Sequence, residues 1–121
     1  MRVIVKHPGM EPEVIEVESI QAINKLVGNV DEDGNGWDHV GSDERQEIGS
    51  GIDGVDIYCR FNAVFNIELK ENLWFNDNHL LCGTVVFAGY DNKNKKTNYG
   101  ACSLTDEQIE NCLTYIGRQK A

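Results

Sequence analysis

The sequence lacks a long apolar run. No stretch of the chain approaches the roughly 18 consecutive apolar residues that are needed to cross a bilayer. The N-terminal residues 1–6 also lack the apolar core of a signal peptide. We therefore expect a protein that makes no membrane contact and stays in the cytoplasm.

Catalytic and metal-binding signatures are also missing. The chain has four cysteines, Cys59, Cys82, Cys102 and Cys112, and they lack the C-x-x-C spacing of a zinc or redox site. Three of them lie inside apolar patterns, which favours buried, reduced thiols. The histidines are far apart in the sequence and fall in no recognised metal or nucleophile motif: His7, His39 and His79. We therefore predict that the protein has no catalytic residues and is not an enzyme.

Basic residues are scarce. The chain has 11 lysines and arginines against 20 aspartates and glutamates, which gives a formal net charge of -9. This charge opposes binding to the phosphate backbone of DNA, so we expect no direct DNA binding. It suits a protein partner with a basic surface, such as a nucleic-acid-binding enzyme. The alternative interpretation is that the charge serves only solubility.

The residues that are present predict an α+β fold. With 121 residues, 40% of them hydrophobic, the chain fits a single domain over residues 1–121. Apolar spacing and capping signals predict helices at about 19–27 and 105–116, with Gly28 and Gly117 as their ends and a capping box at Thr105 and Gln108. We expect both helices to pack on one curved, mainly antiparallel sheet.

Strand patterns occupy most of the remaining chain. Residues 2–6 and 13–17 predict an opening hairpin, and residues 55–59 and 63–69 predict two more strands. Residues 80–89 are almost continuously apolar, which predicts one central strand covered on both faces. Residues at about 29–53 form an acidic, irregular excursion. The opening strand is also expected to lie at a sheet edge, where pairing with a second copy would give a homo-oligomer.

Four short segments carry a family resemblance: Pro8-Gly9-Met10-Glu11-Pro12-Glu13-Val14, Leu26-Val27-Gly28, Gly83-Thr84-Val85-Val86-Phe87-Ala88-Gly89 and Ser103-Leu104-Thr105-Asp106-Glu107-Gln108-Ile109. In this order the chain resembles a domain-of-unknown-function family of bacteriophages and mobile elements, some of whose members are encoded near antirestriction-type genes. The chain departs from the family pattern at residues 29–53 and 70–75. The resemblance implies an accessory protein in the cytoplasm of a bacterial host, with no catalytic residues to carry over.

The acidic excursion is the main candidate site. Its side chains present spaced negative charges, as a decoy for the phosphates that a DNA enzyme grips, and its tryptophan suits a binding hot spot. We assign partner binding to Asp31, Asp33, Trp37, Asp38, Asp43 and Glu44. Together with the resemblance, this predicts stoichiometric inhibition of a host defence component. A solvated loop with Trp37 tucked into the core is the alternative.

Two other sites stay open. Asp31, Asp33 and Asn35 match the first half of a calcium loop, but Ser42 replaces the glutamate at position 12, and an Asx-rich turn is the alternative. A nucleotide second messenger is the other candidate ligand, which the protein would sequester as a sponge. Its phosphates and base would contact Tyr90, Lys93, Lys95, Lys96 and Tyr99, for which an ordinary surface turn is the alternative.

Overall fold

The computed structural model describes residues 1–39, 47–60, 69–75, 79–91, 93 and 98–119 of the chain. In this part of the chain the strands form a six-stranded sheet with the order β2-β1-β7-β4-β3, in which β8 also pairs with β7, and a two-stranded sheet of β5 and β6. Every pairing is antiparallel. The strands are β1 (Arg2–Lys6), β2 (Glu13–Glu16), β3 (Glu47–Gly49), β4 (Val55–Tyr58), β5 (Glu71–Phe75), β6 (His79–Cys82), β7 (Val85–Tyr90) and β8 (Ala101–Cys102).

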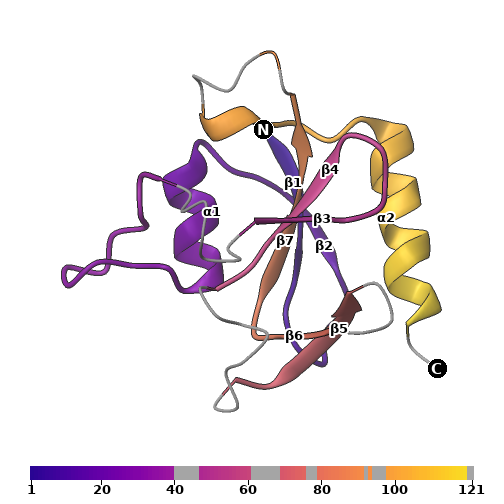
Figure 1. The fold of residues 1–121 in the computed structure, drawn as a ribbon, viewed down its shortest axis with the longest axis horizontal. Helices are drawn as coiled ribbons and strands as arrows, with labels where there is room; N and C mark the ends of the chain where they lie inside the picture. Colours follow the sequence, from indigo (N-terminus) through magenta and orange to yellow (C-terminus); the bar gives the residue numbers. More distant parts are fainter. Residues whose placement is uncertain (40–46, 61–68, 76–78, 92, 94–97, 120–121) are drawn as a thin grey trace.

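Two helices cover opposite faces of the large sheet, as Figure 1 shows. Helix α1 (Ile20–Val27) begins at Ser19, whose hydroxyl accepts a hydrogen bond from the Ala22 amide at 3.4 Å. It ends at Gly28, where a φ of 97° is accessible to glycine at little cost. Helix α2 (Asp106–Arg118) begins with the expected capping box of Thr105 and Gln108. The predicted α+β fold with two packed helices is therefore confirmed.

Alternating side chains divide the core between the two faces. Val3, Val5, Val86 and Ala88 pack with α1, whereas Ile4, Val85 and Phe87 pack with α2 on the other side. Neighbouring strand residues point to opposite faces, so one sheet supplies both clusters. β7 lies in the middle of the sheet and is buried along most of its length. The prediction of a central strand covered on both faces is confirmed for residues 85–89.

Two boundary predictions were wrong. Residues 80–89 do not form one strand, because Gly83 adopts a φ of 79° and separates β6 from β7. Gly117 does not end the last helix, which runs to Arg118. A separate difference concerns the apolar spacing of the second helix, which includes Leu113: this residue is 39% exposed, while Cys112 and Ile116 are buried. Most of the predicted strand at 63–69 lies outside the described residues.

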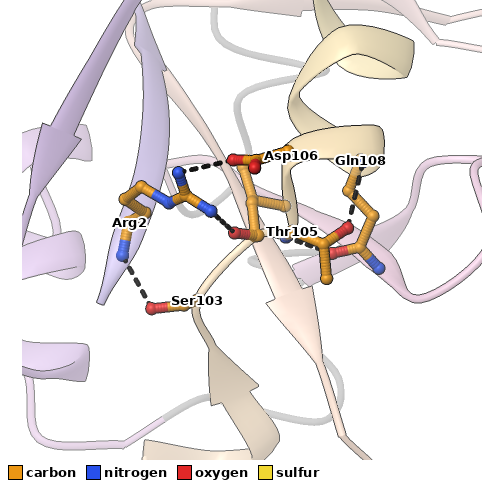
Figure 2. A network of polar contacts seen from close by, with 6 residues as sticks. Arg2, Ser103, Thr105, Asp106 and Gln108 are labelled. Atoms are coloured by element: carbon orange, nitrogen blue, oxygen red, sulfur yellow. Dashed lines mark hydrogen bonds and ion pairs between the residues drawn. The ribbon is translucent and has the colours of Figure 1, made fainter.

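The first strand is tied to the start of α2. Figure 2 shows Arg2 at this junction: its backbone amide donates to Ser103 Oγ at 2.9 Å and its guanidinium donates to Asp106 Oδ1 at 2.8 Å. The second guanidinium nitrogen donates to the Leu104 carbonyl at 3.0 Å, and the Leu104 amide donates back to the Arg2 carbonyl. The Arg2 amide and carbonyl are therefore bonded on the side of β1 that faces away from β2.

A short 3-10 turn, η2 (Asn98–Gly100), leads into β8. Neither described helix is long and apolar enough to span a membrane.

Candidate functional site

The acidic segment, defined here as residues 31–39, begins with a tight turn. The Asp31 carboxylate accepts hydrogen bonds from the backbone amides of Asp33 and Asn35, at 2.9 and 3.0 Å. The Asp31 backbone also pairs with Asn35 and Gly34, and Val30 and Gly36 form an isolated β-bridge. The segment is therefore an ordered turn with an internal hydrogen-bond network, as the Asx-turn interpretation expected.

Glycine lets this turn pack directly against α1. A Cβ atom at Gly36 would overlap the carbonyl oxygen of Gln21 and lie 2.9 Å from the Lys25 amide nitrogen, both within the helix. Only glycine fits at such a close approach of two backbones. Figure 1 shows the tip of the turn projecting beyond α1, away from the sheet.

Two buried asparagines hold the segment in place. Asn24 in α1 has no exposed surface, and its side-chain amide donates to the carbonyls of Trp37 and His39 at 2.8 and 3.2 Å. Asn29 is 2% exposed, and its side-chain amide donates to the Cys59 carbonyl at 3.1 Å. The backbone carbonyl of Asn29 accepts from the Trp37 backbone amide at 3.0 Å. The segment is thus fastened to both α1 and the end of β4.

The outer surface of the segment is negatively charged. Its exposed carboxylates belong to Asp31, Glu32, Asp33 and Asp38. Trp37 is half-buried and stacks on the exposed His39 ring, with centroids 5.5 Å apart and planes 6° from parallel. His39 Nδ1 lies 3.3 Å from Asp38 Oδ1. Trp37 is therefore not fully tucked into the core, and its partner-binding role stays a prediction. Asp43 and Glu44 lie outside the described residues.

The calcium prediction depends on the same turn. Asp31, Asp33 and Asn35 lie within it, but one Asp31 oxygen already accepts two amides. In the described part of the chain, no three His, Cys, Asp or Glu side chains are grouped where they would hold a metal ion. Calcium takes 6–8 oxygen ligands, so three side chains supply too few by themselves.

Of the residues predicted to bind a nucleotide, three lie in the described part of the chain: Tyr90, Lys93 and Tyr99. Lys93 and Tyr99 are exposed, whereas Lys95 and Lys96 lie outside the described residues. Tyr90 lines a pocket together with Asp53 and Asp56. Carboxylates beside a phosphate group raise its energy, so this pocket suits a nucleotide poorly. The assignment stays a prediction.

Burial limits the reactivity of two of the cysteines. Burial raises the pKa of the Cys59 thiol to about 12 and that of Cys112 to about 11, so both carry their proton at neutral pH. All four cysteines are free, as predicted. His7 Nδ1 lies 2.8 Å from Thr84 Oγ1, a contact that the sequence did not suggest.

Comparisons with protein-family models, curated proteins and solved structures found no match to this chain. The resemblance to a phage family therefore stays a prediction, and the candidate sites depend on the geometry of this chain alone.

Sequence reasoning missed the two asparagines that fasten the acidic segment. Both are polar and adjoin a solvent-facing pattern, so nothing in the local sequence marks them as buried. It also missed a pocket of about 380 Å³ whose described lining residues include two cations, Arg60 and Lys70, and no carboxylate. The acidic residues in and next to β2 are visible in the sequence, where glutamates and apolar residues are interspersed from Glu13 to Glu18.

Proposed function

We propose that this protein acts by binding a protein partner stoichiometrically through the acidic segment 31–39, and that the partner presents a basic surface. A nucleic-acid-binding enzyme has such a surface. The family resemblance supports a further step, that the protein is a phage or mobile-element accessory factor and that its partner is a component of host defence. The acid-rich segment then occupies the place of the nucleic-acid phosphates.

One observation carries the proposal: the carboxylates are exposed on a segment whose backbone is held in one conformation. Asn24 donates to two carbonyls of the segment from the buried side, and the Asn29 backbone carbonyl accepts from the Trp37 amide. Gly36 lets the segment contact α1 directly. A binding surface that is already ordered loses less conformational entropy when it binds. A loop that served only solubility would need neither buried fastening amides nor a close backbone approach.

Electrostatics supports the same partner class. The four exposed carboxylates of the segment are part of the chain's formal net charge of -9. A charge of one sign gathered on a protrusion accelerates association with an oppositely charged surface and disfavours partners of the same sign. Such steering weakens as salt is added. The stacked Trp37 and His39 rings provide a rigid aromatic contact beside the charges.

The test removes charge without removing structure. In the segment variant, Glu32→Gln, Asp33→Asn and Asp38→Asn are combined, and Asp31 is kept because its carboxylate supports the turn. The control variant removes three exposed carboxylates elsewhere, with Glu71→Gln, Glu107→Gln and Glu110→Gln. Both variants should melt close to the wild type.

Immobilised wild type, segment variant and control are each incubated with lysate of a bacterial host, and the captured proteins are identified by mass spectrometry. We expect a partner retained by the wild type and the control and lost with the segment variant. The dissociation constant of the purified partner should rise with salt for the wild type and rise less for the segment variant. Identical partner profiles for all three proteins would count against the proposal.

A further inference from the structure

β2 forms one edge of the six-stranded sheet and leaves its outer side open. Met1 and Val17 exchange two backbone hydrogen bonds, of 2.7 and 2.9 Å, which fixes the phase of the ladder between β1 and β2. Hydrogen-bonded and non-hydrogen-bonded pairs alternate along antiparallel strands. The registered pairs Val3 with Ile15 and Val5 with Glu13 are therefore bonded.

Val14 and Glu16 consequently turn their amides and carbonyls away from β1. Their partners Ile4 and Arg2 confirm the phase, because Arg2 uses its amide and carbonyl on the opposite side, toward Ser103 and Leu104. No backbone partner of Val14 or Glu16 occurs among the residues that the structure describes. The edge thus offers two outward amides and two outward carbonyls, which is the template for an added strand.

An apolar groove runs beside this edge. It has a volume of about 490 Å³ and lies between β2 and α1. Its apolar lining comes from Ile15, Val17, Ala22 and Leu26. Ile15 points to the α1 face of the sheet, since its partner Val3 belongs to the cluster packed with α1. An added strand would place every second side chain over this groove.

The charges along the edge select the occupant. Four exposed glutamates lie on or next to β2, namely Glu11, Glu13, Glu16 and Glu18. The N-terminal ammonium lies 3.4 Å from Glu16, and Lys25 lines the groove together with Glu16 and Glu18. Alternation within β2 turns the side chains of Val14 and Glu16 to the face opposite Ile15, and Glu16 and Glu18 also line the groove beside its apolar residues. A strand added at this edge therefore needs basic residues to offset the glutamates and apolar residues over Ile15 and Leu26.

We propose that the open edge of β2 and the adjoining groove bind an extended, basic segment of a partner protein as an added antiparallel strand. Main-chain hydrogen bonds to Val14 and Glu16 supply affinity, and alternating apolar and basic side chains supply specificity. A second copy of this chain fits less well, because it would bring four more glutamates to the same edge. The site is separate from the acidic segment.

The probe is a synthetic peptide of alternating lysine and valine. One control peptide has glutamate in place of lysine, and another carries N-methyl groups on the alternate amides that would face β2. We expect the first peptide to bind and the glutamate peptide not to bind. N-methylation should weaken binding about tenfold or more, because each lost hydrogen bond costs about threefold to tenfold in affinity.

Val14→Pro provides the matching change in the protein. Because the Val14 amide faces outward, proline removes the external donor without breaking the ladder to β1, and edge strands tolerate proline. We expect this variant to bind the lysine–valine peptide about threefold to tenfold more weakly, whereas Val14→Ala, which keeps the amide, binds within about twofold of the wild type. If Val14→Pro does not fold, amide exchange of the wild type decides: the amides of Val14 and Glu16 should exchange quickly in the free protein and slowly with peptide.

Three outcomes would overturn the proposal. One is equal binding of the N-methylated peptide, and another is unchanged exchange at Val14 and Glu16 in the presence of bound peptide. The third is slow exchange of both amides in a peptide-free dimer, detected by light scattering, because a second copy would then occupy the edge. The segment variant of the proposed function should bind this peptide like the wild type, so the two proposals fail independently.

Discussion

Replacing Asn24 with alanine tests whether buried amides hold the acidic segment in place. The Asn24 amide donates to the carbonyls of Trp37 and His39, and alanine removes both bonds without removing any charge. The two carbonyls then have to open toward water or stay buried without this donor. The first result separates the segment from α1, and the second leaves two buried carbonyls without this donor, so both lower the stability of the folded state.

The magnitude follows from the contacts. Each hydrogen bond contributes about 1 kcal/mol, and a carbonyl left buried costs about 1 kcal/mol more. Alanine regains about 0.6 kcal/mol because it favours the helix more than asparagine does. The expected net loss is therefore about 2 kcal/mol in the free energy of unfolding. For a domain of this length it lowers the melting temperature by roughly 8 °C.

Urea unfolding and native-state hydrogen exchange measure the effect. The Trp37 amide, which donates to the Asn29 carbonyl, should exchange faster in Asn24→Ala. Gln21→Ala is the control, since its side chain is exposed on the same helix and should change stability by less than about 0.5 kcal/mol. Wild-type stability together with unchanged exchange at Trp37 would refute the reasoning.

Four further predictions concern other parts of the molecule. Gly36→Ala should destabilise more than a surface substitution, since its Cβ overlaps α1; a thermal melt equal to that of the wild type would contradict this. The folded-state pKa of Cys59 is raised to about 12 from an ordinary 9.0, so the stability that its buried neutral thiol contributes is intact below pH 9 and is lost as the pH rises toward 12. Urea titrations should therefore show that the free energy of unfolding declines less steeply at alkaline pH in Cys59→Ala than in the wild type. Calcium should leave the melting temperature unchanged relative to chelator, because the turn at 31–35 has few ligands, and a rise with calcium would restore the cation site. Cyclic nucleotides should likewise give no thermal shift, because the pocket at Tyr90 is acidic, whereas a site filled at a hundred times the dissociation constant adds about 2.7 kcal/mol.

Local signals predicted the elements that depend on few residues. The N-cap at Ser19, the left-handed Gly28 and the capping box at Thr105 each act within four residues, so both helices begin, and α1 also ends, where the sequence predicts. The apolar run before Tyr90 predicts a central strand because both its faces are buried. These features depend on backbone geometry and capping, which short sequence windows contain.

Tertiary contacts decided the features that sequence reasoning missed. Gly83 reads as a tolerated glycine within a strand, yet its amide donates to the Lys70 carbonyl at 2.7 Å and the strand breaks there. Asn24 reads as a polar helix residue, yet it is buried because the acidic segment folds back over it. The partners of both residues are distant in the chain, so no local pattern encodes them.

The opening hairpin was predicted correctly, but β2 and not β1 lies at the edge.

Helix α1 connects the two acidic surfaces. Its residues Ala22 and Leu26 line the groove beside β2, while the backbone of Gln21 and Lys25 contacts the acidic segment. One basic partner that covers α1 would contact both surfaces, and kinetics can separate their contributions. Charge on the segment steers approach, so its neutralisation should lower the association rate and its salt dependence. Strand addition depends on short-range hydrogen bonds, so Val14→Pro should instead raise the dissociation rate at every salt concentration. A partner whose association rate falls in both variants, with no change in dissociation, would recognise charge alone and make no added strand.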